Sequence, residues 1–170
     1  MSSTLDPRFY YLHNFRKALA WIGDRHADLL DAREQAFLHA FDALDWSAQA
    51  LLVRMIMRKG VHFRASKLNY EEIGCCRQAA AALIANGWVL DDAPLPLDEL
   101  LALLRKDEIV ASFAAQLSDR RARKDELALQ LAEHFEASQA FAAWCPGSDD
   151  VLYSLTIDDL SERLRLMFFG

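Results

Sequence analysis

The sequence predicts a mainly α-helical protein that contains one small β element. Apolar residues recur every three or four positions through most of the 170 residues, which is the spacing of the buried face of an amphipathic helix. A short segment after Gly60 alternates every second residue instead, and this pattern is typical of a strand. Because 53% of the residues are hydrophobic, the chain is able to bury a core of its own.

Three amphipathic helices are expected before Gly60. They cover residues 10–31, 32–44 and about 47–59. Asp31 lies where it would cap the free amides of the second helix, and Gly60 suits the end of the third. The residues expected to face inward are Leu12, Phe15, Leu19, Ile22, Leu29, Phe37, Phe41, Leu44, Leu51, Leu52, Met55 and Ile56.

The next segment changes from helix to strand and back. Residues 61–68 fit a short strand, residues 69–87 two helical pieces broken near Gly74, and residues 88–96 a small β hairpin with prolines at its turn. Helix, strand, helix, helix and hairpin in this order are typical of a winged helix. We therefore predict a winged-helix-like unit.

The second half of the chain is predicted to be helical again. Helices are expected over residues 97–104 and 105–117, and another follows a basic loop and runs to residue 135. A short helix, a break at residues 145–147 and a last helix from about 157 to 169 complete the chain. The inward residues are Ile109, Phe113, Leu117, Leu127, Leu131 and Phe135. This pattern divides the chain into N-terminal helices (1–46), the winged-helix-like unit (47–96), a helix-loop-helix segment (97–136) and C-terminal helices (137–170).

Composition and charge limit the kinds of partner. The net charge of -6 repels phosphate, so any contact with nucleic acid must come from local basic patches. Three cysteines, two of them adjacent, make a poor disulfide framework. No stretch has the pattern of an export leader or of a membrane span. We expect a soluble protein of the bacterial cytoplasm, associated with the nucleoid if it binds DNA.

A search for an active site finds no candidate. No Glu-x-Lys or Asp-x-Lys pair occurs, although restriction-type nucleases need one beside their metal, and no glycine-rich phosphate loop occurs. The five histidines are too dispersed for a metal site. Cys75 and Cys76 are expected to be small core residues, and the aspartate pairs at 91–92 and 158–159 to cap helices. We predict no catalytic residue, metal site or cofactor in this chain.

Two groups of basic residues remain as candidate DNA contacts. The first basic cluster consists of Arg54, Arg58, Lys59, Arg64 and Lys67, at a helix end and in the strand after it. Such a run can neutralise several phosphates of one backbone. The alternative is a solvated helix end whose arginines pair with the glutamates at 71 and 72. Charge alone does not separate these two interpretations.

The second basic cluster consists of Arg120, Arg121, Arg123 and Lys124, in the loop between two apolar-faced helices. A basic loop ahead of a helix N-terminus offers both cationic side chains and free backbone amides to a phosphate. The helix dipole disfavours cations at that position unless an anion binds there. Phosphate contact is therefore the favoured interpretation of this cluster.

The helix that would read bases in a winged helix is nearly all apolar. Only Arg77, Gln78 and Asn86 could act as donors or acceptors to base edges. We therefore expect a scaffold or a backbone clamp, and a sequence-specific transcription factor is the least favoured function.

Several segments resemble the N-terminal region of the Fanconi-associated nucleases. They are YYLHNFRKALAWIGDRHADLLDAREQAFLHAFDAL, LLVRMIMRKGVHFRASKLNYEEIG and LIANGWVL, and the second contains Arg-Lys-Gly, Phe-Arg, Lys-Leu-x-Tyr and Glu-Ile-Gly in order. The segment RKDEIVASFAAQLSDRRARKDELALQLAEHF is similar to the SAP motif that this family carries next, a helix, basic loop and helix that bind the DNA backbone. Its loop has Arg-Ala-Arg-Lys at 121–124, where a SAP motif commonly has a glycine before its lysine.

The resemblance implies a function in DNA repair. In this family a VRR-type nuclease domain, which follows a helical-repeat region, cuts branched DNA with a 5' flap and helps to unhook interstrand crosslinks with Mg²⁺ or Mn²⁺. Neither region is present here, although ERLRLMFFG looks like the point where the family runs on. This chain is implied to grip duplex backbone beside the branch through the two basic clusters. Its implied partners are branched DNA and the C-terminal domains of the same protein.

A function of another class stays open. The apolar residues at the end of the chain, Phe168 and Phe169 among them, have little sequence left to cover them. They would suit a protein-interaction scaffold that packs on its own nuclease domain or on a partner and touches DNA little.

Overall fold

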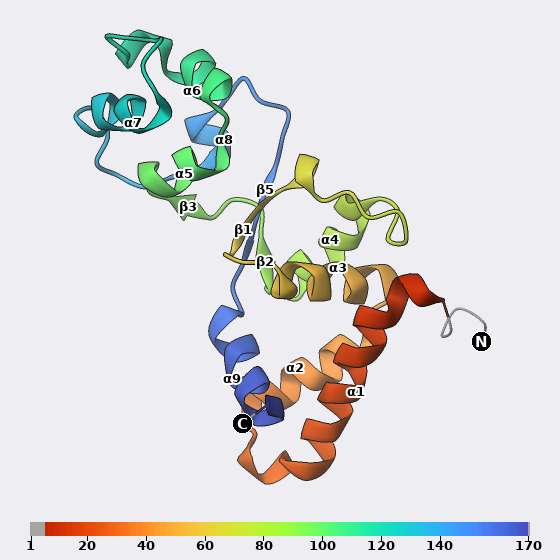
Figure 1. Cartoon of the computed structure of the whole chain (residues 1–170). Helices are drawn as coiled ribbons and strands as arrows, with labels where there is room; N and C mark the ends of the chain where they lie inside the picture. Colours follow the sequence, from red (N-terminus) through yellow and green to blue (C-terminus); the bar gives the residue numbers. More distant parts are fainter. Residues whose placement is uncertain (1–5, 170) are drawn as a thin grey trace. The chain divides into compact units, whose positions relative to one another are not determined.

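The computed structural model describes residues 6–169, with side chains for residues 6–167 (Figure 1). It divides into two compact units. The first unit contains the chain up to Leu90 and again from Ser154, and the second unit contains Asp91–Tyr153. In the part of the chain that is described, no helix is long and apolar enough to cross a membrane.

Five helices form most of the first unit. They are α1 (Tyr10–Arg25), α2 (Ala32–Ala43), α3 (Trp46–Met57), α4 (Cys76–Ala85) and α9 (Asp158–Phe169). Helix α1 packs against α2, α3 and α9, and α3 also packs against α4. As predicted, Asp31 caps α2, and it does so in a capping box with Glu34. The fully buried side chains here include Leu12, Ile22, Phe41, Leu51, Leu52, Met55 and Leu83.

Helix α1 is shorter than predicted. It ends at Arg25, because the backbone of His26 leaves the helical region and a short 3₁₀ turn, Ala27–Leu29, follows. Leu29, which was predicted to face inward, is therefore 56% exposed, and Leu30 is buried instead. The expected helical piece after residue 69 is likewise reduced to one turn, in which the amides of Ile73 and Gly74 donate to the carbonyl of Tyr70.

A small antiparallel sheet completes the first unit. Its strands are β1 (His62–Arg64), β5 (Leu152–Leu155), of which Ser154 and Leu155 belong to the first unit, and β2 (Val89–Leu90), in the order β1-β5-β2. Strand β2 pairs antiparallel with β5, so that Val89 lies opposite Leu155 and Leu90 opposite Ser154. The sheet of the winged-helix-like unit is thus present, but the partner of β2 comes from far along the chain rather than from a local hairpin.

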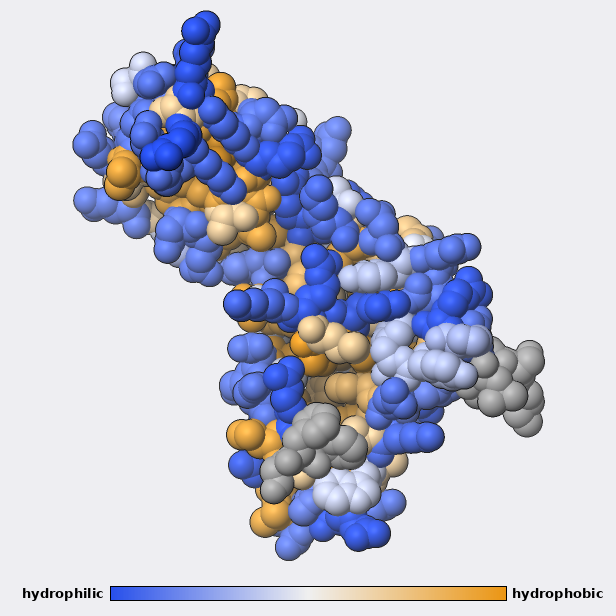
Figure 2. Space-filling view, viewed as in Figure 1, coloured by the Kyte–Doolittle hydropathy of each residue, from blue (hydrophilic) through white to orange (hydrophobic). Residues whose placement is uncertain are grey.

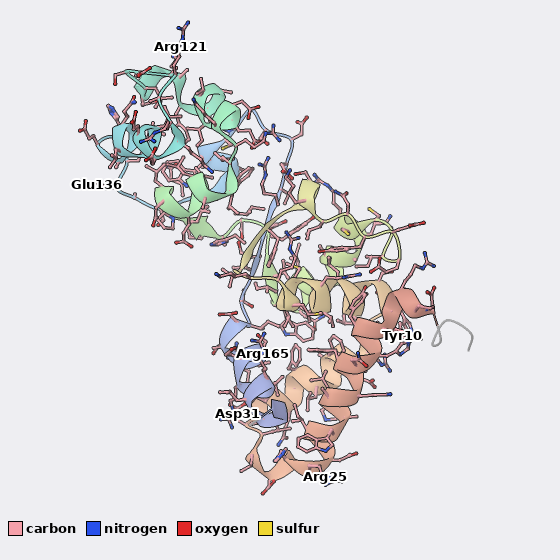
Figure 3. All side chains as sticks on the ribbon, viewed as in Figure 1. Tyr10, Arg25, Asp31, Arg121, Glu136 and Arg165 are labelled. Atoms are coloured by element: carbon pink, nitrogen blue, oxygen red, sulfur yellow. The ribbon has the colours of Figure 1, made fainter. Side chains whose placement is uncertain are left out.

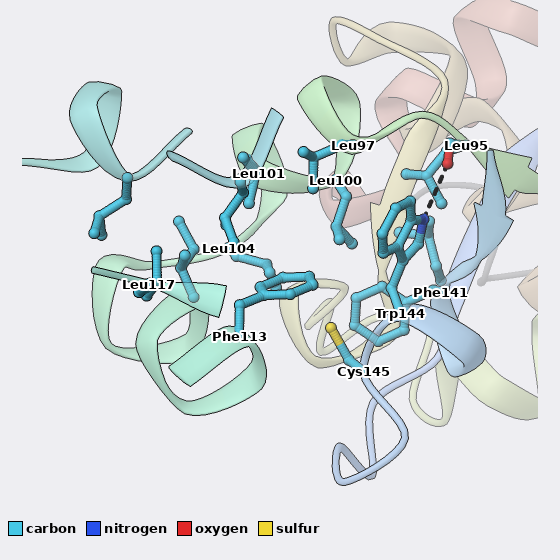
Figure 4. Packing of buried hydrophobic residues seen from close by; sticks show 14 of the residues in the cluster. Leu95, Leu97, Leu100, Leu101, Leu104, Phe113, Leu117, Phe141, Trp144 and Cys145 are labelled. Atoms are coloured by element: carbon cyan, nitrogen blue, oxygen red, sulfur yellow. Dashed lines mark hydrogen bonds between the residues drawn. The ribbon is translucent and has the colours of Figure 1, made fainter. Parts of the chain in front are cut away.

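The second unit is a small helical unit with its own core (Figure 4). It contains α5 (Leu97–Leu103), α6 (Lys106–Phe113), α7 (Lys124–Ala132) and α8 (Phe141–Trp144), and β3 (Pro94–Leu95) pairs antiparallel with β4 (Gln139–Ala140). The indole Nε1 of Trp144 donates to the carbonyl of Leu95 over 3.0 Å. Helix α7 ends before Phe135, whose half-buried ring still packs edge-on against Trp144.

Several smaller predictions need correction. Cys76 is buried as expected, but Cys75 is exposed. Asp91 and Asp92 lie in the bend between β2 and β3 and cap no helix. At the end of the chain Leu164 is buried while Leu166 is 67% exposed. The side chains of Phe168 and Phe169 lie outside the described residues.

Candidate nucleic-acid interface

In the structure, some residues of the first basic cluster are exposed and the others are buried or held by neighbouring side chains. Arg58 and Lys59 follow the end of α3, and Lys67 lies in the short 3₁₀ helix Ala65–Lys67, and all three side chains are exposed. Arg64, on β1, is only 7% exposed. Arg54, in the last turn of α3, is held by other residues. Only three of the five predicted residues are therefore open to a ligand on the surface of the first unit.

The guanidinium of Arg54 lies in a cage of aromatic and acidic side chains. It stands over the ring of Tyr11 at 4.0 Å from the centroid and over that of Tyr70 at 4.8 Å. Its Nη2 donates to Oε2 of Glu72 over 2.8 Å, and the hydroxyl of Tyr11 donates to the same oxygen over 2.7 Å. Arg54 thus joins α1, α3 and the turn after residue 69. Here the structure agrees with the alternative of an arginine paired with a glutamate.

The contacts in the Arg54 cage also shift the pKa values of Glu72 and Tyr11. Burial by itself raises the pKa of the Glu72 carboxyl, but the hydrogen bonds from Arg54 and Tyr11 outweigh it and hold the pKa below its ordinary value of 4.5. Burial, and next the hydrogen bond to Glu72, raise the pKa of the Tyr11 hydroxyl. Glu72 is therefore charged and Tyr11 neutral at physiological pH.

The lowered pKa of Glu72 predicts a pH dependence of stability. A carboxyl whose pKa is lower in the folded state stabilises the fold above its unfolded pKa, and this contribution is lost as the pH falls through the folded value. We expect the difference in urea midpoint between wild type and Glu72→Gln to be largest at neutral pH and to shrink below pH 4.5. Glu71→Gln, which removes the same charge from an exposed neighbour, is the control. If the difference in urea midpoint stayed constant down to pH 3, about one unit below the pKa of free carboxyls, Glu72 would not have the lowered pKa assigned to it.

Arg58 is exposed but has a defined position. Its guanidinium stands over the ring of Phe63 at 5.4 Å from the centroid, and Nη1 makes a long contact of 3.4 Å with the hydroxyl of Tyr70. No carboxylate of the described residues pairs with it. Since a stacked guanidinium keeps its donors free, Arg58 can offer them to a phosphate.

The second basic cluster lies in the loop before α7 and in its first turn. All four side chains are exposed, and Figure 3 shows Arg121 pointing away from the second unit. Arg120 donates to the carbonyl of Ala114 over 3.2 Å, and Arg123 lies 3.7 Å from both Asp125 and Glu126. Within residues 6–167, the side chains of Arg121 and Lys124 have no ion pair. These two cations are the most available of the cluster.

The loop does not require the glycine of the SAP motif. Among the described residues, a positive φ occurs only at Gly60, Gly74 and Gly87, so every residue of the loop has an ordinary backbone conformation. Ala122 is 7% exposed and belongs to the core of the second unit, which fastens the loop at its middle. The loop therefore has a well-defined conformation without the glycine of the SAP motif.

Lys106 is a basic residue of this region that sequence reasoning missed. It opens α6, and its Nζ donates to the carbonyl of Arg121 over 3.1 Å. It thus adds a fifth cation beside the four of the second basic cluster. The Lys-Asp-Glu run that contains it looked like an ordinary helix start, so only the folded loop reveals its position.

Helix α4 has the apolar character that its sequence predicted. Cys76, Ala79, Ala80 and Leu83 are buried, and the helix packs on α3. Its exposed polar side chains are Arg77, Gln78 and Asn86, the last of which caps the helix end by donating to the carbonyl of Ala82. Few side chains on the exposed face of this helix can therefore donate or accept hydrogen bonds.

The described residues provide no site for a catalytic metal. No three His, Cys, Asp or Glu side chains among them come close enough to hold an ion. The resemblance places its Mg²⁺ or Mn²⁺ in a nuclease domain outside this chain.

The fold and the basic surfaces define the class of protein, a helix-turn-helix unit combined with a helix-loop-helix unit of the SAP type. Two family models match these units: "FAN1, HTH domain" over residues 9–90 and "Fanconi anemia-associated nuclease SAP domain" over residues 94–144. The chain belongs to the Fanconi-associated nuclease family.

Relatives and solved structures agree with this assignment. The Fanconi-associated nuclease 1 homolog of Pseudomonas aeruginosa is 48% identical over 169 residues, which is 99% of this chain and 30% of the relative. The homolog of Oryza sativa subsp. japonica is 35% identical over 79 residues, 46% of this chain and 8% of the relative. The crystal structure of paFAN1 bound to 2nt 5'flap DNA with gap matches with a TM-score of 0.94 at 48% identity, over 97% of this chain and 30% of that one. The present chain thus spans less than a third of the length of these relatives.

Proposed function

We propose that the chain is the DNA-binding module of a structure-selective repair nuclease and grips duplex backbone beside a branch without reading its sequence. The observation that carries this proposal is the second basic cluster. It presents Arg121 and Lys124 on a defined loop beside the N-terminus of α7, where the N-cap residue Arg123 caps no amide with its side chain and the amide of Glu126 donates to the carboxylate of Asp125. Cationic side chains next to a helix N-terminus suit a phosphate.

Three further observations support the proposal. Arg58, Lys59 and Lys67 form a second exposed basic group on a protein of net charge -6, where diffuse attraction to DNA is excluded. Helix α4 has few donors for base edges, which suits backbone contact. A relative of 48% identity has been crystallised with flap DNA.

The remaining parts of the proposal concern the whole protein. A metal-dependent nuclease domain and a helical-repeat region would follow this module and would supply the cleavage of the flap. The module would act on DNA in the bacterial cytoplasm and would position the branch for that domain.

The double variant Arg121→Ala with Lys124→Ala tests this function. In an anisotropy titration with a 5' flap duplex, we expect roughly tenfold weaker binding at about 0.1 M salt and a slope of log Kd against log salt lower by about two, one for each lost phosphate contact. Wild type should prefer the flap to plain duplex and be indifferent to sequence. Lys17→Ala with Arg25→Ala removes two exposed cations from α1 and is the matched control.

Equal and weak binding by wild type and the double variant would remove the second basic cluster from the proposal. Self-association of the chain with no shift of a flap substrate would favour the protein-interaction scaffold instead.

A further inference from the structure

Gln130, on α7, fastens the start of the loop that carries the second basic cluster. Its Oε1 accepts from the amide of Ser118 over 2.9 Å, from the hydroxyl of Ser118 over 3.1 Å and from the amide of Asp119 over 3.1 Å. Its Nε2 donates to the carbonyl of Asp119 over 3.2 Å. One half-buried side chain thus makes four hydrogen bonds to two consecutive loop residues.

These contacts continue into the basic residues. The carboxylate of Asp119 accepts from the backbone amide of Arg121 over 3.0 Å, and Ala122 is held in the core of the second unit. The loop is therefore fixed by Gln130 at 118–119 and by Ala122 three residues later. Arg121 lies between these two anchors.

We infer that Gln130 is a positioning residue for DNA binding: it holds the loop in the shape that presents Arg121 and Lys124 to phosphate. This inference rests on the proposed function. In this chain a side chain orders the loop, whereas a loop with the glycine of the SAP motif would be ordered by a different backbone conformation. An unfastened loop would have to be ordered during binding, and this ordering costs affinity. The number of phosphates contacted would not change.

Gln130→Met provides a clean test in the full 170-residue chain, because methionine keeps the length of the side chain and removes all four hydrogen bonds. We expect flap-duplex binding to weaken roughly three- to tenfold with an unchanged slope of log Kd against log salt, since no cation is lost. Arg121→Ala should instead lower that slope by about one. Amide hydrogen exchange at Ser118 and Asp119 should become faster in Gln130→Met.

Gln116→Met is the matched control, because Gln116 lies in the same unit and its side chain makes no hydrogen bond within residues 6–167. It should bind like wild type. Wild-type affinity of Gln130→Met beside weakened Arg121→Ala would overturn the inference and leave the proposed function standing. A lower salt slope in Gln130→Met would also overturn it, because the residue would then act through lost contacts. Absence of DNA binding by wild type would overturn both.

Discussion

Arg54→Ala is expected to lower the free energy of unfolding of the first unit by about 2 to 3 kcal/mol, although Arg54 was predicted from the sequence as a DNA contact. The change removes the partner of Glu72, whose side chain is 7% exposed, and the stacking on two tyrosine rings. Leaving a buried carboxylate unpaired is the costly part. The loss is smaller than for a fully buried pair because the Arg54 side chain is itself 33% exposed. Urea unfolding followed by tryptophan fluorescence measures the loss.

Arg58→Ala is the matched control for Arg54, one helical turn further along. Its guanidinium is exposed and stacks on one ring, so we expect a loss of stability below about 1 kcal/mol. Arg54→Lys should remain destabilised, because an ammonium cannot donate from two nitrogens to one carboxylate while stacking between rings. Full stability of Arg54→Ala, or equal losses in the two alanine variants, would show that the cage does not hold α1, α3 and the turn together.

Leu127→Ala is expected to destabilise the second unit by about 3 kcal/mol. Leu127 is fully buried in the core that α7 shares with α5 and α6, and a leucine-to-alanine change at such a site loses transfer energy and leaves a cavity. A unit of about 60 residues has little stability to lose, so this change removes a large part of it. Hydrogen exchange should become faster at the amides of α5, α6 and α7.

Leu129→Ala is the control for this change on the same helix. Its side chain is 72% exposed, and we expect an effect within about 0.5 kcal/mol. Equal protection of the amides in both variants would contradict the assigned core.

The long amphipathic helices and the family could be predicted from the sequence. Their apolar spacing selects the buried face directly, and the cap at Asp31 follows from one side chain and its own backbone. The ordered run from Arg58 to Gly74 carries the resemblance. These signals are local, so no knowledge of the folded chain is needed to find them.

The contacts between distant residues could not be predicted. Glu72 pairs with Arg54 from 18 positions away, and charge alone allowed either this pair or a free arginine. Arg64 alternates with apolar residues as an outward strand residue would, yet it is buried. In the sequence, Gln130 looks like any polar residue of a helix. It makes four hydrogen bonds only because the loop returns to α7 in the folded chain.

The central position of β5 has a consequence for how the chain can be divided. The family model that matches the first unit ends at Leu90, but the middle strand of the sheet, β5, comes some sixty residues later. A protein that contained only residues 9–90 would therefore lack β5, and the edges of β1 and β2 that pair with it would be exposed. In the sequence, the SAP unit lies between Leu90 and Ser154. These two residues lie opposite each other in one antiparallel pair, about 5 Å apart at their Cα atoms. Taking out residues 91–153 would therefore also remove Leu152 and Tyr153, the first half of the strand that lies in the middle of this sheet.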